Sequence, residues 1–290
     1  MIRPQISFEF FPPKNFEASF QLWDTVQVLA PLAPRFISVT YGAGGTTRDL
    51  TRDAVTTLHK FSGLRVAAHL TCVDASRKQI MEIAASFAAG GVTDIVALRG
   101  DPAKGAAGFT RHPEGFKSSV ELISALSKTG HFTLRVAAYP ETHPEAKTSS
   151  SDIDFLKRKI DAGASEALTQ FFFEAETFLR FRDACDKAGI RVPITPGILP
   201  IENWAGTLRF AKACKTHVPD WLGQAFSKAQ RDGREDLLAT TVCTELCSQL
   251  TDEGVNFLHF YTLNRPDLTR DICHALGVTV ADTLTYRRLS

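Results

Sequence analysis

The sequence predicts an α/β fold, a single (β/α)8 TIM barrel, from two regularities. Short apolar runs rich in β-branched and aromatic residues alternate eight times with stretches of helical periodicity. Six glycines also recur a few residues before strands, where a helix must end, and glycine suits the left-handed residue after a last helical turn. They are Gly63, Gly91, Gly130, Gly163, Gly189 and Gly254. Eight βα units are the number that closes such a barrel.

The eight expected strands are Gln5–Phe10, Phe36–Thr40, Arg65–Leu70, Asp94–Leu98, Leu134–Tyr139, Ala167–Phe172, Arg191–Thr195 and Phe257–Tyr261. After the first strand, one helix is expected to turn a single apolar face inward, made of Phe16, Phe20, Trp23, Val26 and Leu29. After the third strand, Ser76 is expected to cap a helix that carries Ile80, Ile83 and Phe87 toward the core.

The interval between the seventh and eighth strands is longer than one βα unit requires. We expect an extra helix there: two helices near 203–217 and 234–252, joined by a loop around 219–233. A second long loop, 101–113, has the Gly- and Ala-rich composition typical of lids. No linker divides residues 1–290, so one domain is expected. The alternative is an open doubly wound sheet, but no strand is followed by a dinucleotide or P-loop glycine motif.

Charge and composition exclude several classes of protein. The 290 residues carry 33 Lys+Arg against 32 Asp+Glu, a net charge of +1, so neither nucleic acid nor an anionic membrane is an expected partner. No apolar run reaches the roughly 18–20 residues of a membrane span, and the chain is expected to be cytoplasmic. Its six cysteines form no CxxC and are expected to be buried thiols.

In a βα barrel the active site lies at the C-terminal ends of the strands, where this sequence is unusually polar. The residues there are Glu9, Thr40, Tyr41, His69, Arg99, Gly100, Asp101, Tyr139, His143, Gln170 and the segment 261–265. Glu9 stands among phenylalanines, so burial should raise its pKa and suit it to general-acid catalysis; the alternative is a carboxylate bonded to backbone or arginine at the rim.

The other polar residues have structural readings beside the functional ones. Asp101 also suits a turn or helix cap, and His69 a satisfied core histidine. Gln170 fits recognition of a heterocyclic edge or a bridge inside the barrel. Glu141 and His143 lack further ligands at metal spacing, so no metal is expected. No strand lysine or nucleophile elbow supports Schiff-base or acyl chemistry.

Two further segments have possible anion-binding roles. The glycines of 42–47 lead toward a helix whose amides could bind phosphate, but no lysine follows them. Arg158 and Lys159 are either solvated helix charge or a clamp on a pyrophosphate.

Nine segments together resemble the methylenetetrahydrofolate reductase family in its short bacterial form. They are FEFFPPK from Phe8, SVTYGAGG from Ser38, HLTC from His69, ALRGD from Ala97, AAYPETHPEAK from Ala137, LKRKIDAGA from Leu156, TQFFF from Thr169, PGILP from Pro196 and HFYTLNR from His259. The resemblance implies a barrel that holds FAD non-covalently and reduces 5,10-methylenetetrahydrofolate to 5-methyltetrahydrofolate. It implies NADH or NADPH as donor, reducing the flavin before the folate takes hydride from flavin N5, and a homo-oligomer.

The resemblance also implies residue roles. Glu9 would be the general acid, and Asp101 would lie near both flavin and folate. Gln170, Phe210 and Arg265 would contact the substrate. FAD contacts would come from Thr40, Tyr41, Ala43, His69, Arg99, Gly100, Asp101, Tyr139, His143, Ala146, Asp152, Arg158 and Lys159.

The chain departs from the family pattern at two positions. Gly206 stands where relatives carry a substrate-contacting glutamine, and Phe155 where some have asparagine. The resemblance implies no regulatory domain within 290 residues. Two other functions remain as alternatives: a flavin-free barrel lyase or aldolase, and a non-catalytic folate-binding subunit.

Overall fold

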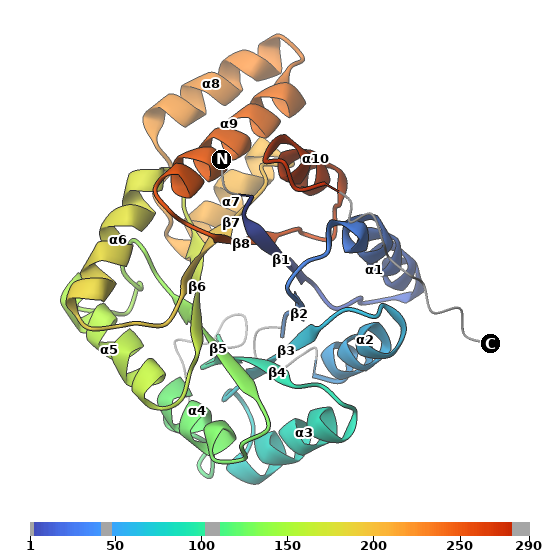
Figure 1. Ribbon diagram of the computed structural model, residues 1–290, viewed down its shortest axis with the longest axis vertical. Helices are drawn as coiled ribbons and strands as arrows, with labels where there is room; N and C mark the ends of the chain where they lie inside the picture. The colour runs from blue at the N-terminus through green and yellow to red at the C-terminus, as the bar shows by residue number, and fades with distance from the viewer. Residues whose placement is uncertain (1–2, 42–47, 102–110, 280–290) are drawn as a thin grey trace.

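Eight parallel strands form a closed barrel in the order β1 to β8, with β8 pairing back onto β1. The computed structural model describes residues 3–41, 48–101 and 111–279. Figure 1 shows the strands as a ring with the helices outside it. The predicted (β/α)8 architecture is therefore confirmed.

The strands are β1 Gln5–Phe10, β2 Ile37–Val39, β3 Val66–Thr71, β4 Asp94–Leu98, β5 Thr133–Ala138, β6 Glu166–Phe171, β7 Ile194–Ile198 and β8 Phe257–Tyr261. The helices are α1 Phe16–Leu29, α2 Arg48–Phe61, α3 Arg77–Ala89, α4 Ser119–Ser127, α5 Ser149–Asp161, α6 Ala175–Lys187, α7 Trp204–Cys214, α8 Asp220–Arg231, α9 Glu235–Asp252 and α10 Asp267–Ala275, with a 3₁₀ turn Ala30–Leu32 after α1. The six glycines before strands all have positive φ, between 66° and 120°, as predicted.

The predicted seventh strand, Arg191–Thr195, was wrong by three residues. Strand β7 instead runs through Pro196 and Gly197, although proline cannot donate to a strand ladder. The β6–β7 pairing is irregular at this point, which accommodates the proline.

Between β7 and β8 the chain forms three helices rather than two. The stretch 219–233, expected to be a loop, contains α8, whose Leu222, Phe226 and Ala229 are buried along one face. Pro219 precedes the helix and Gly233, with φ 63°, follows it, so both punctuation residues lie outside the helix. Figure 1 shows α7, α8 and α9 grouped at one side of the ring.

Helix α1 packs a different face from the one expected. Phe16 and Phe20 are 79% and 55% exposed and touch each other edge to face at 4.7 Å, whereas Leu22, Val26 and Leu29 face the barrel. The helix carries two apolar stripes, and periodicity alone did not distinguish them. In α3 the prediction was right: Ser76 forms a capping box with Gln79, and Ile80 and Phe87 are buried.

Buried charges fill the N-terminal end of the barrel interior. Arg135 on β5 contacts Asp94 on β4 at 2.5 Å and Glu166 on β6 at 2.8 Å. Glu166 also receives hydrogen bonds from Arg35 at 3.0 Å and Thr195 at 2.7 Å. Asp94 also accepts from Arg65 Nε at 2.6 Å, so each of these buried carboxylates is paired with two arginines, as buried charges require.

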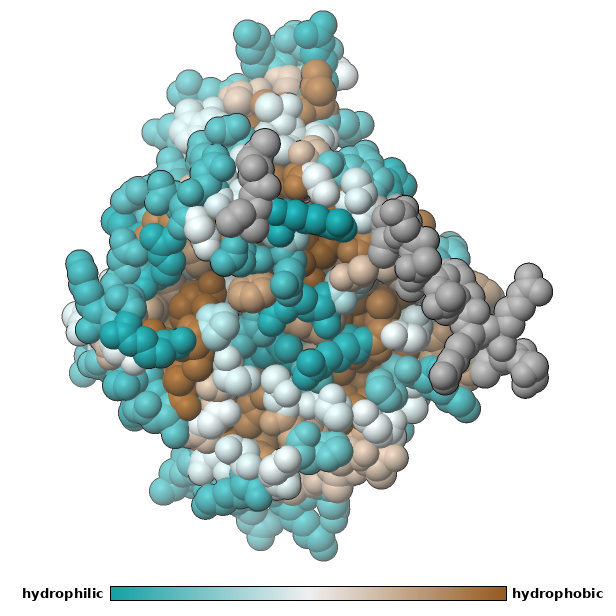
Figure 2. Space-filling model, viewed as in Figure 1, coloured by the Kyte–Doolittle hydropathy of each residue, from teal (hydrophilic) through white to brown (hydrophobic). Residues whose placement is uncertain are grey.

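An interior stack connects this charged layer with the other end of the barrel. The Arg135 guanidinium lies 3.8 Å from the centre of the Phe36 ring, and Phe36 stacks on the imidazole of His259 at 5.7 Å. The outer surface is more polar, and Figure 2 shows hydrophilic side chains gathered over the middle of the face in view. In the part of the chain that the structure describes, no helix has the length and apolar character to cross a membrane.

Candidate active site

A carboxylate and two imidazoles from three strands meet in the barrel interior, Glu9 and His69 near the C-terminal ends of their strands and His259 at the middle of its own. Glu9 on β1 places Oε2 at 3.2 Å from Nε2 of His69 on β3 and 3.5 Å from Nε2 of His259 on β8. The second nitrogen of His259, Nδ1, lies 2.8 Å from Ser7 Oγ. The pairing of β1 with β8 brings Ser7, Glu9 and His259 together, since Ser7 pairs with His259 and Glu9 with Tyr261, and His69 reaches Glu9 from β3, beyond β2.

The pKa of Glu9 differs from the sequence expectation. Burial raises it, but His69 and His259, whose Nε2 atoms lie within 3.5 Å of Oε2, act in the opposite direction and outweigh burial, so the pKa is lowered to about 2. The prediction of a raised pKa was wrong because it considered only the phenylalanines next to Glu9 in sequence. The free protein holds Glu9 as a carboxylate beside two potential proton donors.

Sequence reasoning assigned no role to Ser7 or His259. Both are buried, at 1% and 0% exposure, and each lies two residues before a polar residue at a strand end, on the same face of its strand. This spacing of two, Ser7 with Glu9 and His259 with Tyr261, is the signal that could have identified them.

The residues after β4 form a tight corner. Gly100 has φ 88°, and a Cβ there would lie 2.9 Å from both Thr71 and Val73, so this position needs glycine. Arg99 donates two hydrogen bonds to the carboxylate of Glu145, one of them at 2.9 Å, and this bonding raises its pKa. Asp101 follows and is exposed.

The segment between β5 and α5 carries two aromatic rings held in place by the helix. Tyr139 and His143 pack edge to face at 4.5 Å. The backbone N–H of His143 donates to Asp152 Oδ2 at 2.7 Å, and Ala146 N–H donates to the His143 carbonyl at 2.8 Å. Thr142 between them has φ 81°, a strained value for a β-branched residue. Asp152 therefore anchors this loop.

Two cations on α5 flank an aromatic ring. The Lys159 ammonium and Arg158 guanidinium lie 5.0 and 4.8 Å from the centre of the Phe155 ring. Lys159 Nζ donates to the Ala137 carbonyl at 2.7 Å, and burial lowers its pKa to about 8. Phe155 thus supports both cations through cation–π contact.

The predicted substrate contacts lie at the ends of β6, α7 and β8. Phe210 is 37% exposed and stacks on Phe171 at 5.2 Å, next to Gln170, which is partly buried. Arg265 is exposed in the turn after β8, where its N–H donates to the Thr262 carbonyl at 2.8 Å. Gly206 N–H donates to the capping side chain of Asn203 at 2.8 Å, so the glycine contributes to the start of α7.

Thr40 and Tyr41, at the end of β2, are tied to α2. The Thr40 carbonyl accepts from Thr51 Oγ1, and the Tyr41 hydroxyl accepts from Arg48 Nε, both at 2.9 Å. Ala43, the glycines of 42–47 and most of the 101–113 loop lie outside the described residues.

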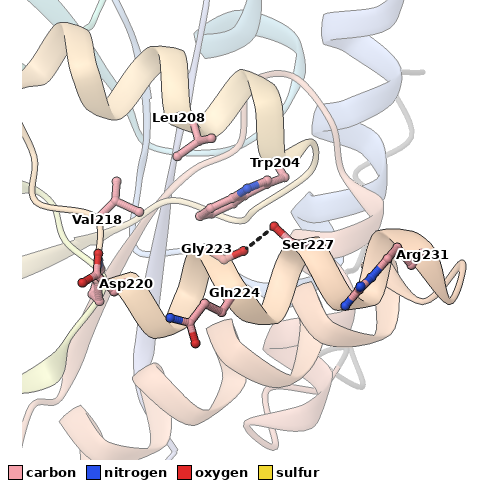
Figure 3. A pocket seen from close by; sticks show the side chains of 9 residues that line it. Trp204, Leu208, Val218, Asp220, Gly223, Gln224, Ser227 and Arg231 are labelled. Atoms are coloured by element: carbon pink, nitrogen blue, oxygen red, sulfur yellow. Dashed lines mark hydrogen bonds between the residues drawn. The ribbon is translucent and has the colours of Figure 1, made fainter.

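Two surface grooves lie apart from these residues. One, of about 840 Å³, runs between α7 and α8 and includes Trp204, Leu208 and Gly223; Figure 3 shows the flat Trp204 indole facing Gly223 across it. The other, of about 960 Å³, lies at the ends of α5, α6 and α7. No predicted site residue lines either groove. Among the residues that the structure describes, no group of three or more His, Cys, Asp or Glu could hold a metal ion.

Comparison with known proteins relates this arrangement to one family. The family model for methylenetetrahydrofolate reductase matches residues 2–277. A 5,10-methylenetetrahydrofolate reductase of Pectobacterium carotovorum is 44% identical over 95% of this chain and 91% of its own length. The enzyme of that name from Escherichia coli K12 is 43% identical over 94% and 90%. A solved structure of an uncharacterized Clostridium thermocellum protein that binds 5-methyl-5,6,7,8-tetrahydrofolic acid has a TM-score of 0.61 at 14% identity, covering 95% of this chain and 94% of its own.

Proposed function

This chain belongs to the methylenetetrahydrofolate reductase family, a family of oxidoreductases, and on that premise we propose that it forms 5-methyltetrahydrofolate with FAD and a nicotinamide donor, NADH or NADPH. The observation that carries the proposal is the pairing of Glu9 with His69 and His259 in the barrel interior. This cluster supplies a proton where the substrate ring must open. A flavin held by these residues would supply the redox chemistry, the transfer of hydride from donor to folate.

The residues near β3 to α5 suit a large anionic cofactor. Lys159 is a buried cation whose charge burial disfavours, and a pyrophosphate beside it would restore that charge. Beside the tight Gly100 corner, Thr71 Oγ1 is buried without a hydrogen-bond partner in the structure, so a polar group of a bound cofactor could satisfy it. We assign the cofactor to the set Thr40, Tyr41, Ala43, His69, Arg99, Gly100, Asp101, Tyr139, His143, Ala146, Asp152, Arg158 and Lys159.

Glu9 is proposed as the group that protonates the folate at N10, which converts the bridging carbon to a reactive iminium. Its low pKa means that Glu9 is a carboxylate in the free protein and must take up a proton before it can act as an acid. Transfer from His69 or His259 to Oε2 spans 3.2 or 3.5 Å. Exclusion of water by bound substrate favours the neutral carboxyl over a buried carboxylate, so substrate binding would prepare the acid.

Gln170, Phe210 and Arg265 are proposed to bind the substrate. An amide both donates and accepts, as the edge of a pterin requires. The half-exposed face of Phe210 can stack on an aromatic ring, and the guanidinium of Arg265 suits the glutamate carboxylate of a folate. Asp101, next to the Gly100 corner, is proposed to act on both flavin and folate.

The test is a visible spectrum of the purified protein under anaerobic conditions, with NADH and then methylenetetrahydrofolate added in turn. We expect a flavin band that bleaches with NADH and returns with the folate. A flavin-loaded protein that bleaches but stays bleached would overturn the substrate assignment. Failure to retain flavin after reconstitution would overturn the cofactor assignment and favour a flavin-free barrel enzyme; flavin retention without turnover would favour a non-catalytic folate-binding subunit.

A further inference from the structure

Strands β6 and β7 do not pair regularly beside the substrate residues. Leu168 pairs with Thr195 and Phe171 with Gly197, so two residues of β6, Thr169 and Gln170, oppose only Pro196 of β7. Two residues against one is the arrangement of a β-bulge, and bulges next to active sites redirect side chains.

The bulge leaves the Thr169 carbonyl without a backbone donor on β7. Pro196 has no N–H, and the N–H of Gly197 is used by the Thr169 hydroxyl at 2.9 Å. The carbonyl is satisfied instead from β8, where the Tyr261 hydroxyl donates to it at 2.6 Å. A buried carbonyl needs such a partner, because leaving it unpaired carries a large desolvation cost.

This bond passes over a position that must be glycine. A Cβ on Gly197 would lie 2.1 Å from the Thr169 oxygen and 2.8 Å from the Tyr261 hydroxyl. The small residue therefore lets a tyrosine of β8 reach across β7 to β6.

The same irregularity determines how Gln170 is held. Its Oε1 accepts from the N–H of the next residue, Phe171, at 3.0 Å, a backbone donor that a regular ladder would offer to a neighbouring strand. The amide NH₂ of Gln170 has no such local bond among the contacts of the described chain, and Phe171 carries the stacked ring of Phe210. The bulge thus sets the place of two proposed substrate residues.

We propose that Tyr261 is a positioning residue for substrate recognition: through its hydroxyl bond to the Thr169 carbonyl, across Gly197, it fixes the bulge that presents Gln170 to the folate. The inference rests on the proposed function, since Gln170 is assigned to the folate there.

The first experiment is a double-mutant cycle of Tyr261→Phe and Gln170→Ala. Tyr261→Phe should raise KM for methylenetetrahydrofolate about tenfold, because the Thr169 carbonyl loses its donor, while the rate of flavin bleaching by NADH stays within about twofold. In the Gln170→Ala background the same change should add less than about twofold, since the two residues act as one unit. Independent, multiplying effects would overturn the proposal.

Thr169 gives the matched comparison. Thr169→Ser keeps the hydroxyl that accepts from Gly197 at 2.9 Å and should leave KM near that of the natural protein, whereas isosteric Thr169→Val removes this second bond of the bulge and should raise KM as Tyr261→Phe does. Equal KM values for the serine and valine variants would contradict the proposal that the bulge positions Gln170.

Amide hydrogen exchange separates this proposal from the proposed function. Exchange at Phe171 should be faster in Tyr261→Phe than in the natural protein, with exchange at Val96 on the distant β4 unchanged. Unchanged exchange at Phe171 would overturn the claim that Tyr261 fixes the bulge, whether or not the protein reduces a folate. Faster exchange in a protein without folate turnover would support the role of Tyr261 in fixing the bulge and overturn the folate assignment.

Discussion

At the scale of single residues, the protonation of Glu9 is decided by its neighbours rather than by its burial. Two imidazole nitrogens within 3.5 Å of one carboxylate oxygen lower its pKa to about 2, and Ser7 fixes the ring of the fully buried His259. A carboxylate kept charged in the resting protein needs its histidines for acid catalysis, which leads to two expectations.

Replacing Glu9 by glutamine should slow folate reduction by about 10²- to 10⁴-fold, the usual contribution of a general acid. Flavin reduction by NADH should change little, because that half-reaction needs no proton at the folate. Stopped-flow absorbance of the two half-reactions measures both. Glu17→Gln, an exposed residue of α1, is the control. Equal losses in both half-reactions would exclude the acid role.

Replacing His259 by glutamine should raise the pKa of Glu9, since burial would then act against fewer lowering contacts. A carboxyl stretch of the protonated acid should appear in infrared difference spectra at a pH where the variant is still folded and the natural protein shows none, and vanish in a Glu9→Gln background. A titration that does not move would show that His69 alone sets the Glu9 charge.

At the scale of elements, α5 holds the loop that carries Tyr139 and His143. The bond from His143 N–H to Asp152 Oδ2 restrains a segment strained at Thr142. Asp152→Ala should therefore weaken FAD binding about tenfold through loss of a charge-assisted hydrogen bond. Flavin fluorescence on dilution measures the affinity.

Asp154→Ala, an exposed residue of the same helix, is the matched control and should retain flavin as the natural protein does. An equal loss in both variants would indicate that the charge of the helix matters and the loop anchor does not.

The elements also show how far sequence reasoning extends. Strands β1, β4 and β8 have the predicted bounds, because glycine and polar punctuation lie outside them. Strand β7 was misplaced because the bond that compensates Pro196 comes from Tyr261 on another strand, a contact no local pattern encodes. Helix α8 was missed because Pro219 and Gly233 resemble a loop when the buried face between them is not considered.

The candidate site likewise contains residues that the sequence could identify and residues that only the tertiary structure reveals. Glu9, His69, Arg99 and Gln170 were identifiable as polar residues at strand ends, whereas the roles of Ser7 and His259 depend on register between β1 and β8. The contacts of Phe155 and Asp152 depend on packing around α5, so they could not be predicted from composition.

At the scale of the whole molecule, the charged layer around Arg135 ties stability to pH. Burial raises the pKa values of Asp94 and Glu166, but hydrogen bonds and nearby arginines lower them overall. Carboxyls with lowered folded pKa values stabilise the fold above the unfolded pKa of about 4, and this contribution is lost as the pH falls below it. We therefore expect acid unfolding to begin near that value.

Arg135→Met should destabilise the protein by about 3–5 kcal/mol at pH 7, because two buried carboxylates lose a shared partner. The deficit should shrink as the pH falls toward 5, since protonation removes the uncompensated charge. Urea midpoints at both pH values measure it. Arg52→Met, which breaks only exposed pairs on α2, should cost less than about 1 kcal/mol at either pH. A loss of unfolding free energy that does not depend on pH would mean that Arg135 stabilises the fold through its packing and not through its charge.

The ring of Phe36 touches the guanidinium at one end of the barrel and the imidazole of His259 toward the other. A substitution near Arg135 that moves the Phe36 ring would therefore also move the imidazole of His259, which lies beside Glu9. Substitutions that stabilise the N-terminal end of the barrel would therefore also change the surroundings of Glu9. Variants of this protein would have to be selected for stability and activity together.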